Sequence, residues 1–189
     1  MRSVTLLGAG SFAVGCLLTG MLLAGCAPAV PVPRFTPVDA PPPRFANDAE
    51  ALAAAEEAYG AYIAVSDQIS QDGGHNPERI LPYVSEKAAE AELASFELLR
   101  ESNRRTVNSS RFFGLELRQV VQTPERAVVT FWVCDDVSDV RILDADDHDV
   151  TTASYSEVWQ FEVEAEAVRD DTDLKIVRAV SRESDECER

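Results

Sequence analysis

Residues 155–165, Tyr-Ser-Glu-Val-Trp-Gln-Phe-Glu-Val-Glu-Ala, alternate between apolar and polar side chains. The apolar series is Tyr155, Trp159, Phe161 and Val163, and the polar series is Ser156, Gln160, Glu162 and Glu164. Successive side chains of a β-strand point to opposite faces of its sheet. The stretch therefore predicts a strand from Tyr155 to Ala165 with one buried and one solvated face, as is typical of an antiparallel sheet covered on one side.

The neighbouring residues have the same two-residue period. Apolar residues recur at alternate positions from Leu115 to Val133, with residues 123–126 as a turn between the two halves. This pattern predicts an antiparallel hairpin. We expect a short strand at 140–143, a polar turn at 144–149, and a last strand that begins at Leu174 and leads toward Cys187.

The first half of the chain has helical spacing instead. Asn47 is suited to cap a helix, and Glu50 completes a capping-box-like pattern. The apolar residues that follow at helical spacing are Leu52, Ala55, Tyr59, Tyr62, Ile63 and Ile69. They predict one long amphipathic helix, which Gly73 and Gly74 end.

Two shorter helices are expected next. Asn76 and Pro77 occupy the cap and first-turn positions of the first. Its inward residues are expected to be Ile80, Leu81 and Val84. Ser85 is suited to cap the second, whose inward residues are expected to be Ala89, Leu93, Phe96 and Leu99. Helices followed by strands predict an α+β fold class, with N-terminal helices packed on a curved antiparallel sheet.

The N-terminus resembles the signal of a bacterial lipoprotein. Arg2 precedes an uncharged apolar run that ends at Leu23-Ala24-Gly25-Cys26, a tetrapeptide similar to the lipobox. The resemblance implies cleavage before Cys26, diacylglycerol on the Cys26 sulfur, and a further acyl chain such as palmitate on the new amine. We expect a protein anchored by lipid to the outer face of the cell membrane. A permanent transmembrane anchor is the alternative, since no charge lies between Arg2 and Arg34.

A proline-rich stretch follows the signal. Residues 27–45 hold seven of the ten prolines, a composition that favours extended polyproline II over a packed core. The sequence therefore predicts a signal peptide at 1–25, a lipidated Cys26 with its tether at 26–46, and a single domain at 47–189.

The net charge limits the partners. The chain carries a formal charge of −16, which repels nucleic acid and anionic lipid headgroups. The expected partners are the membrane, through the N-terminal lipid, and an unknown envelope protein or small ligand. Phe131 and its neighbour Trp132 must lie on opposite faces of their strand. One of them therefore faces outward, where it would serve a homodimer or another interaction patch.

The cysteines predict a disulfide, because the N-terminal signal indicates that the domain is exported. Cys16 lies in the signal and Cys26 takes lipid, which leaves Cys134 and Cys187 as a pair in the exported domain. Such a pair predicts a disulfide. A redox or metal role is the alternative, but the sequence has no C-x-x-C spacing and no histidine near either residue.

The domain from residue 47 to 187 resembles a known family. The long first helix, the two shorter helices, the segment Val-Cys-Asp-Asp-Val-Ser at 133–138 and the later Trp159 are similar to the nuclear-transport-factor-2-like (cystatin-like) cone of actinobacterial exported lipoproteins. This resemblance implies a curved sheet that wraps the long helix and leaves a pocket at its open end. In enzymes of that superfamily, such as polyketide cyclases and ketosteroid isomerases, the cone holds an Asp or His base with a Tyr or Asp donor.

No acid–base pair stands out in the sequence. His75 and His148 fall in polar loops, and Tyr59 and Tyr62 have the spacing of core residues on the long helix. We therefore assign no catalytic residue and no cofactor. The adjacent Arg104 and Arg105 belong to a basic stretch that we interpret as a solvated loop.

Two acidic clusters also have simple interpretations. The run Asp144, Asp146, Asp147, His148 and Asp149 begins like a calcium loop. It then has Asp149 where an EF-hand needs glycine and Tyr155 where it needs glutamate, so we interpret it as a polar hairpin turn and assign no metal. The second cluster, Glu162, Glu164 and Glu166, is interpreted as the solvated face of a strand, and attraction of a cationic partner is its alternative.

Two hypotheses on function remain. The first is a membrane-anchored, exported lipoprotein of the cell envelope that acts as a non-enzymatic binding or scaffolding module. It predicts a pocket with no buried ionisable residue. The second is a small-molecule enzyme or carrier that uses the cone pocket. It predicts a buried Asp or His that faces a Tyr, and it would lose support if Tyr, Phe and Leu side chains filled the pocket.

Overall fold

The computed structural model describes residues 42–152, 157–168, 171, 173–182 and 187. All of them belong to one unit, Asp39–Arg189. The predicted signal peptide, Cys26 and most of the predicted tether lie outside the described residues. Among the helices that are described, none is both long and apolar enough to cross a membrane.

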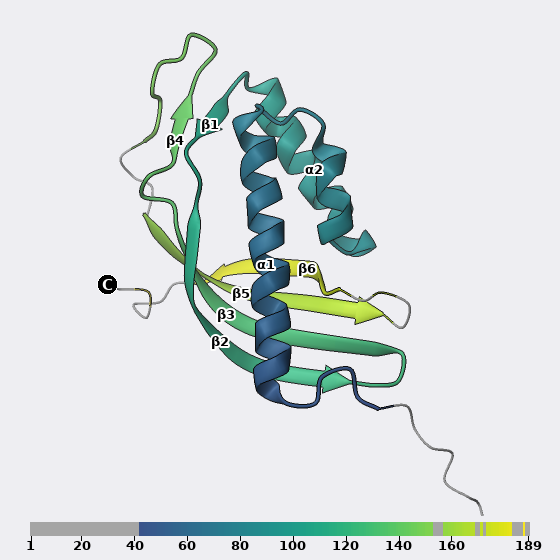
Figure 1. Cartoon of the computed structure of the whole chain (residues 1–189). Helices are drawn as coiled ribbons and strands as arrows, with labels where there is room; N and C mark the ends of the chain where they lie inside the picture. The colour runs from purple at the N-terminus through teal and green to yellow at the C-terminus, as the bar shows by residue number, and fades with distance from the viewer. Residues whose placement is uncertain (1–41, 153–156, 169–170, 172, 183–186, 188–189) are drawn as a thin grey trace, which may run out of the picture. The chain divides into compact units, whose positions relative to one another are not determined.

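The described part of the chain has three helices followed by six strands. The helices are α1 (Asp48–Gln71), the 3₁₀ helix η1 (Pro77–Tyr83) and α2 (Glu86–Glu101). The strands are β1 (Arg105–Val107), β2 (Arg111–Gln122), β3 (Arg126–Asp136), β4 (Arg141–Leu143), β5 (Val158–Val168) and β6 (Lys175–Arg182). Strands β2, β3, β5 and β6 form an antiparallel sheet in that order, and β1 pairs with β4. This arrangement confirms the α+β class. Figure 1 shows α1 lying across the concave side of the curved sheet, with α2 beside it.

Helix α1 begins and ends as predicted. The Asn47 side chain accepts a hydrogen bond from the Glu50 N–H, and the turn after the helix has positive φ angles at Gly73 and Gly74. Gly74 also allows a close approach, because a Cβ there would lie 2.2 Å from the carbonyl oxygen of Phe96 in α2. The turn therefore fixes the end of α1 against α2.

The second helix differs from the prediction. Asn76 adopts a left-handed conformation with no side-chain cap, and Leu81, expected to face inward, is 41% exposed. A 3₁₀ helix has three residues per turn, so Leu81 lies off the face of the buried Ile80. At α2 the prediction is confirmed, since the Ser85 hydroxyl accepts a hydrogen bond from the Ala88 N–H.

The concave face of the sheet forms the core. In β3 and β5 the pairs Phe131/Val163 and Val133/Phe161 lie opposite each other. Phe131, Val133 and Val163 are fully buried beneath α1, together with Tyr59 of that helix. Strand β5 begins at Val158 and ends beyond the predicted Ala165, while Tyr155 lies outside the described residues.

The convex face is charged and internally paired. The Trp132 ring lies between the guanidinium groups of Arg118 and Arg182, whose centres are 3.7 and 4.2 Å from its centroid. The predicted glutamate face carries further ion pairs: Arg178 to Glu162 and Glu164, and Arg126 to Glu166. Arginines of this same chain therefore neutralise the face.

Two features link residues that flank the helices and strands to the sheet. The backbone N–H of Phe45 donates to Gln122, and the Phe45 side chain is buried, so the end of the predicted tether packs on the folded unit. Cys134 and Cys187 form a disulfide with a Cα–Cα distance of 5.7 Å, which confirms the predicted pair.

Of the two strands of the small sheet, the sequence predicted one: the short strand expected at 140–143 is confirmed as β4, and β1 was missed. Residues 105–107, interpreted as part of a solvated loop, form β1 and pair with β4, and Arg105 forms an ion pair with Asp147 at 2.7 Å. Three residues are too few for a two-residue period to be recognised.

Candidate functional site

A cleft of about 710 Å³ lies beside the concave face of the sheet, where β3 and β5 approach the β1/β4 pair. The register of β3 with β5 places Asp135 opposite Trp159, one step beyond the pair Val133/Phe161. Asp135, Trp159 and Phe161 all line the cleft. Its apolar wall is formed by Val137, Val140, Ile142, Trp159 and Phe161.

Asp135 is the buried carboxyl of this cleft. Asp135 is 8% exposed, and its Oδ2 accepts a 2.7 Å hydrogen bond from the Tyr59 hydroxyl. Its other oxygen, Oδ1, is buried and has no hydrogen-bond partner among the described residues. The pKa of Asp135 is raised from 3.8 to about 6. Burial is the largest cause of this net rise, the hydrogen bond from Tyr59 opposes it, and the charge of Asp67 adds to it.

Aromatic rings hold Tyr59 in place. Its ring meets Phe112 and Phe131 edge-on, at centroid distances of 5.4 and 5.8 Å. Burial, with the nearby Asp135 carboxylate, raises the Tyr59 pKa well above its usual range, so the phenol keeps its proton. Tyr59 is therefore a fixed hydrogen-bond donor to Asp135.

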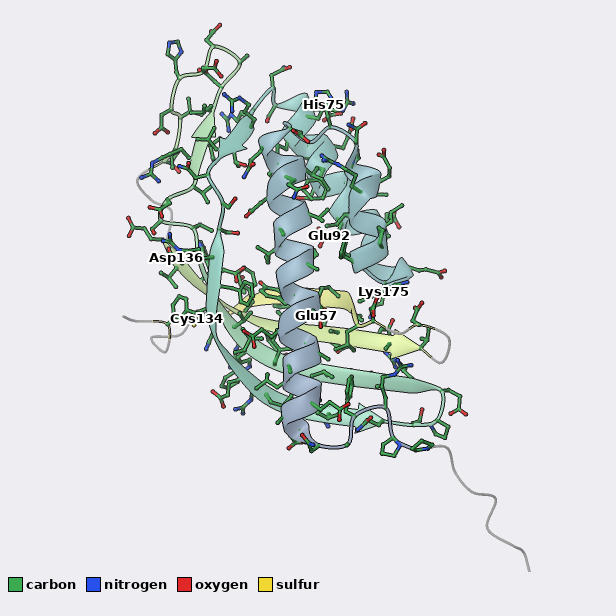
Figure 2. All side chains as sticks on the ribbon, viewed as in Figure 1. Glu57, His75, Glu92, Cys134, Asp136 and Lys175 are labelled. Atoms are coloured by element: carbon green, nitrogen blue, oxygen red, sulfur yellow. A yellow bond between two sulfur atoms is a disulfide. The ribbon has the colours of Figure 1, made fainter. Side chains whose placement is uncertain are left out.

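A second tyrosine–carboxylate pair lies between α1 and α2. The Tyr62 hydroxyl donates a 3.0 Å hydrogen bond to Glu92, which Figure 2 labels. Burial raises the pKa of Glu92, and the bond from Tyr62 lowers it. Tyr62 also contacts the ring of Tyr59, at a centroid distance of 6.0 Å. This pair ties α2 to the helix that carries Tyr59.

Asp136 shows how a buried carboxyl is normally satisfied. It is 2% exposed, lies 3.1 Å from an Arg111 guanidinium nitrogen, and accepts from the Ser138 N–H through Oδ1. It is labelled on β3 next to Cys134 in Figure 2. Asp135 has no such cation within ion-pair distance among the described residues.

The other charged side chains of the cleft are Arg141, Asp149 and Glu157. Arg141 donates to the backbone carbonyls of Ser138 and Val140, and its Nε lies 3.9 Å from Asp149. Within the described part of the chain, Glu157 forms no ion pair.

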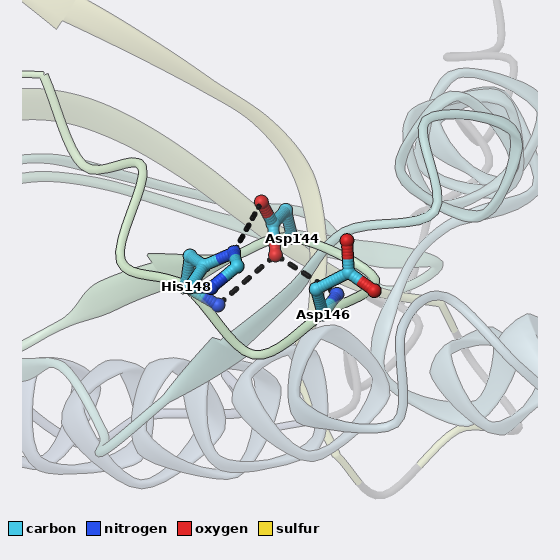
Figure 3. A group of neighbouring side chains, drawn as sticks. All are labelled: Asp144, Asp146 and His148. Carbon is cyan, nitrogen blue, oxygen red and sulfur yellow. Dashed lines mark hydrogen bonds and ion pairs between the residues drawn. The ribbon is translucent and has the colours of Figure 1, made fainter.

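The acidic residues that follow β4 form hydrogen bonds within their own hairpin turn. Figure 3 shows Asp144, Asp146 and His148, whose candidate ligand atoms lie within 4.8 Å of one another. Asp144 Oδ1 accepts from the backbone N–H groups of Asp146 and His148, at 2.9 and 3.0 Å. The carboxylate thus closes a hairpin turn, and Asp146 and His148 are exposed. His75 is exposed as well, in the loop before η1.

Sequence reasoning missed Asp135 as a site residue. The available signal was the pair Asp135-Asp136 at the end of an otherwise apolar strand, because alternation must turn one of two adjacent carboxyls toward the core. Which tyrosine meets that carboxyl depends on how α1 crosses the sheet, and no local pattern encodes this.

Comparisons with known proteins show a likeness of fold to a solved structure, but they do not show a family for this chain. No family profile and no curated protein matches the chain. The crystal structure of the intermembrane space region of the chloroplast protein ARC6 superposes with a TM-score of 0.50 at 14% identity, covering 70% of this chain and 97% of that chain. The Kfla4162 protein from Kribbella flavida superposes with a TM-score of 0.35 at 17% identity, covering 71% and 91%. The likeness to the ARC6 region shows a shared fold alone.

Proposed function

We propose that this chain is an exported, lipid-anchored lipoprotein of the cell envelope whose domain binds a small molecule in the cleft at Asp135. The single observation that carries this proposal is the buried Asp135 carboxyl, with one oxygen on Tyr59 and the other without a partner among the described residues. The binding-or-scaffolding hypothesis predicts a pocket free of buried ionisable groups. Asp135 instead favours the small-molecule hypothesis.

The physical reason is the cost of an unsatisfied acceptor. A buried polar atom without a hydrogen bond costs about 1–3 kcal/mol, and more when it is charged. A ligand that donates to Asp135 Oδ1 removes this cost on binding. The apolar wall around Trp159 and Phe161 supplies burial for the rest of such a ligand.

A proton-transfer enzyme is the second candidate. Burial raises the pKa of Asp135 to about 6, and a carboxyl with a pKa near the working pH is suited to general base catalysis. Tyr59 would then hold the carboxyl in position. The same pairing supports the proposal that the domain belongs to the nuclear-transport-factor-2-like cone.

The proposed export and lipid anchor rest on the N-terminal sequence. Labelled palmitate should be incorporated by the wild type and by Cys16→Ser, and Cys26→Ser should abolish incorporation. Incorporation by Cys26→Ser would overturn the assigned anchor.

The test of ligand binding is native mass spectrometry of the protein purified from envelope extracts. We expect a copurifying small molecule on the wild type and on Asp173→Asn, a control at an exposed residue before β6, and loss of that molecule from Asp135→Asn. Equal retention by Asp135→Asn would contradict the proposed role of the carboxyl. If the bound molecule is chemically altered during incubation with the wild type but not with Asp135→Asn, the proton-transfer enzyme is the favoured hypothesis.

A further inference from the structure

We infer that the cleft selects a cation, namely a protonated amine on an apolar body. The inference deepens the proposed function and rests on it, because it names the chemical class of the ligand that Asp135 would bind. Three observations lead to it: the charge balance of the wall, the unsatisfied oxygen of Asp135, and the aromatic ring opposite that residue.

The wall of the cleft has excess negative charge. It contains three carboxylates, from Asp135, Asp149 and Glu157, and one guanidinium, from Arg141. That guanidinium is already engaged by two backbone carbonyls and lies near Asp149. Asp135 and Glu157 are therefore left without a cation in the part of the chain that the structure describes.

Asp135 favours a ligand group that donates a hydrogen bond and also carries a positive charge. Its Oδ1 needs a hydrogen-bond donor, and an ammonium group provides three N–H donors together with the positive charge that a buried carboxylate lacks. A neutral hydroxyl supplies a hydrogen bond without that charge. A carboxylate ligand supplies neither, and it would be repelled by the wall and by the −16 charge of the chain.

Trp159 adds a second contact for a cation. It pairs directly with Asp135 across β3 and β5, so its side chain lies on the same face of the sheet. The face of an indole ring attracts cations more than that of any other side chain. Carboxylate and indole thus both line a cleft whose wall also contains the aliphatic side chains of Val137, Val140 and Ile142.

The test compares three probes with one chain and different head groups: n-octylammonium, 1-octanol and octanoate. The protein is the chain from residue 26 with Cys26→Ser, oxidised at its disulfide, and with Trp132→Phe so that Trp159 is its single tryptophan. Binding is followed by Trp159 fluorescence and by calorimetry. We expect octylammonium to bind about tenfold or more tightly than 1-octanol, and octanoate to bind weakest.

Variants locate the selectivity. Asp135→Asn should reduce the preference for the amine to about threefold or less, Glu157→Gln should reduce it partly, and Asp173→Asn should leave it unchanged. Equal binding of octylammonium and 1-octanol would overturn the cation inference while leaving the proposed binding function intact. Binding of none of the three probes would overturn both, and a preference that survives in Asp135→Asn would overturn the assignment to that carboxyl.

Discussion

Tyr59 and Asp135 are 76 residues apart in sequence and are joined by a 2.7 Å hydrogen bond inside the domain. The bond connects the middle of α1 to the end of β3 and fixes the carboxyl at the wall of the cleft. It occupies one of the two carboxylate oxygens, so the protein holds the group in position without neutralising it. A site of this kind is preorganised for a donor that arrives from outside.

The Asp135 pKa predicts a specific pH dependence of stability. Its value of about 6 in the folded protein lies above the ordinary 3.8, so the folded state binds more protons between those two values. The stability that Asp135 contributes is therefore present below pH 3.8 and is lost as the pH rises through about 6. Relative to wild type, Asp135→Asn should gain up to about 3 kcal/mol between acidic and mildly alkaline pH.

Urea unfolding of both proteins across this pH range measures the difference. Asp173→Asn serves as the control, because it makes the same Asp-to-Asn change at an exposed residue that does not line the cleft. A constant difference for Asp135→Asn would contradict the raised pKa.

The disulfide should supply a large part of the stability. Cys134 and Cys187 close a loop over a sequence separation of 53, for which the chain-entropy relation gives about 4 kcal/mol. The free energy of unfolding should fall by about this amount on reduction of the wild type. Alkylation followed by mass spectrometry should find free thiols at both positions only after reduction, and free thiols in the exported protein would contradict the bond.

Gly74 should be the least replaceable glycine among those described. Its φ is +79°, and an added Cβ would lie 2.2 Å from the Phe96 carbonyl oxygen. Gly74→Ala should therefore lower the free energy of unfolding by about 2 kcal/mol or more. Gly60→Ala is the matched control within α1, where the new Cβ would meet the Phe112 ring at 3.4 Å. Its effect should lie within about 1 kcal/mol of wild type, and equal losses at both positions would contradict the close approach.

The two faces of β3 should differ in their response to truncation. Phe131 is fully buried under α1, and Phe131→Ala should cost about 3–5 kcal/mol. Trp132 is half-buried between two arginines on the convex face, so Trp132→Ala should cost clearly less, about 1–2 kcal/mol. Thermal and urea unfolding measure both values, and a larger loss for Trp132→Ala would contradict the assignment of faces.

The sequence predicted the elements whose pattern is local. Asn47 and Ser85 cap their helices, and the alternation around Phe131 and Trp159 places these residues on the predicted face. The exposure of Leu81 was not predicted, because a 3₁₀ helix and a short α-helix share the same start signals. Strand β1 was missed, since three polar-flanked residues carry no period.

The site was less accessible to sequence analysis than the fold. The disulfide could be predicted by counting cysteines, whereas the Tyr59–Asp135 contact depends on where α1 crosses the sheet. A tyrosine with core spacing has the same sequence pattern whether its hydroxyl meets a backbone carbonyl or a carboxyl. The chemistry of the cleft therefore emerged only from the tertiary packing.

The disulfide also indicates which side of the protein is suited for attachment to a sensor surface. Cys134 and Asp135 are adjacent in β3, so their side chains point to opposite faces of the sheet. The disulfide therefore holds Cys187 on the Cys134 side of the sheet. Attachment of the protein to a sensor surface through this convex side would leave the cleft open to the solution flowing past it.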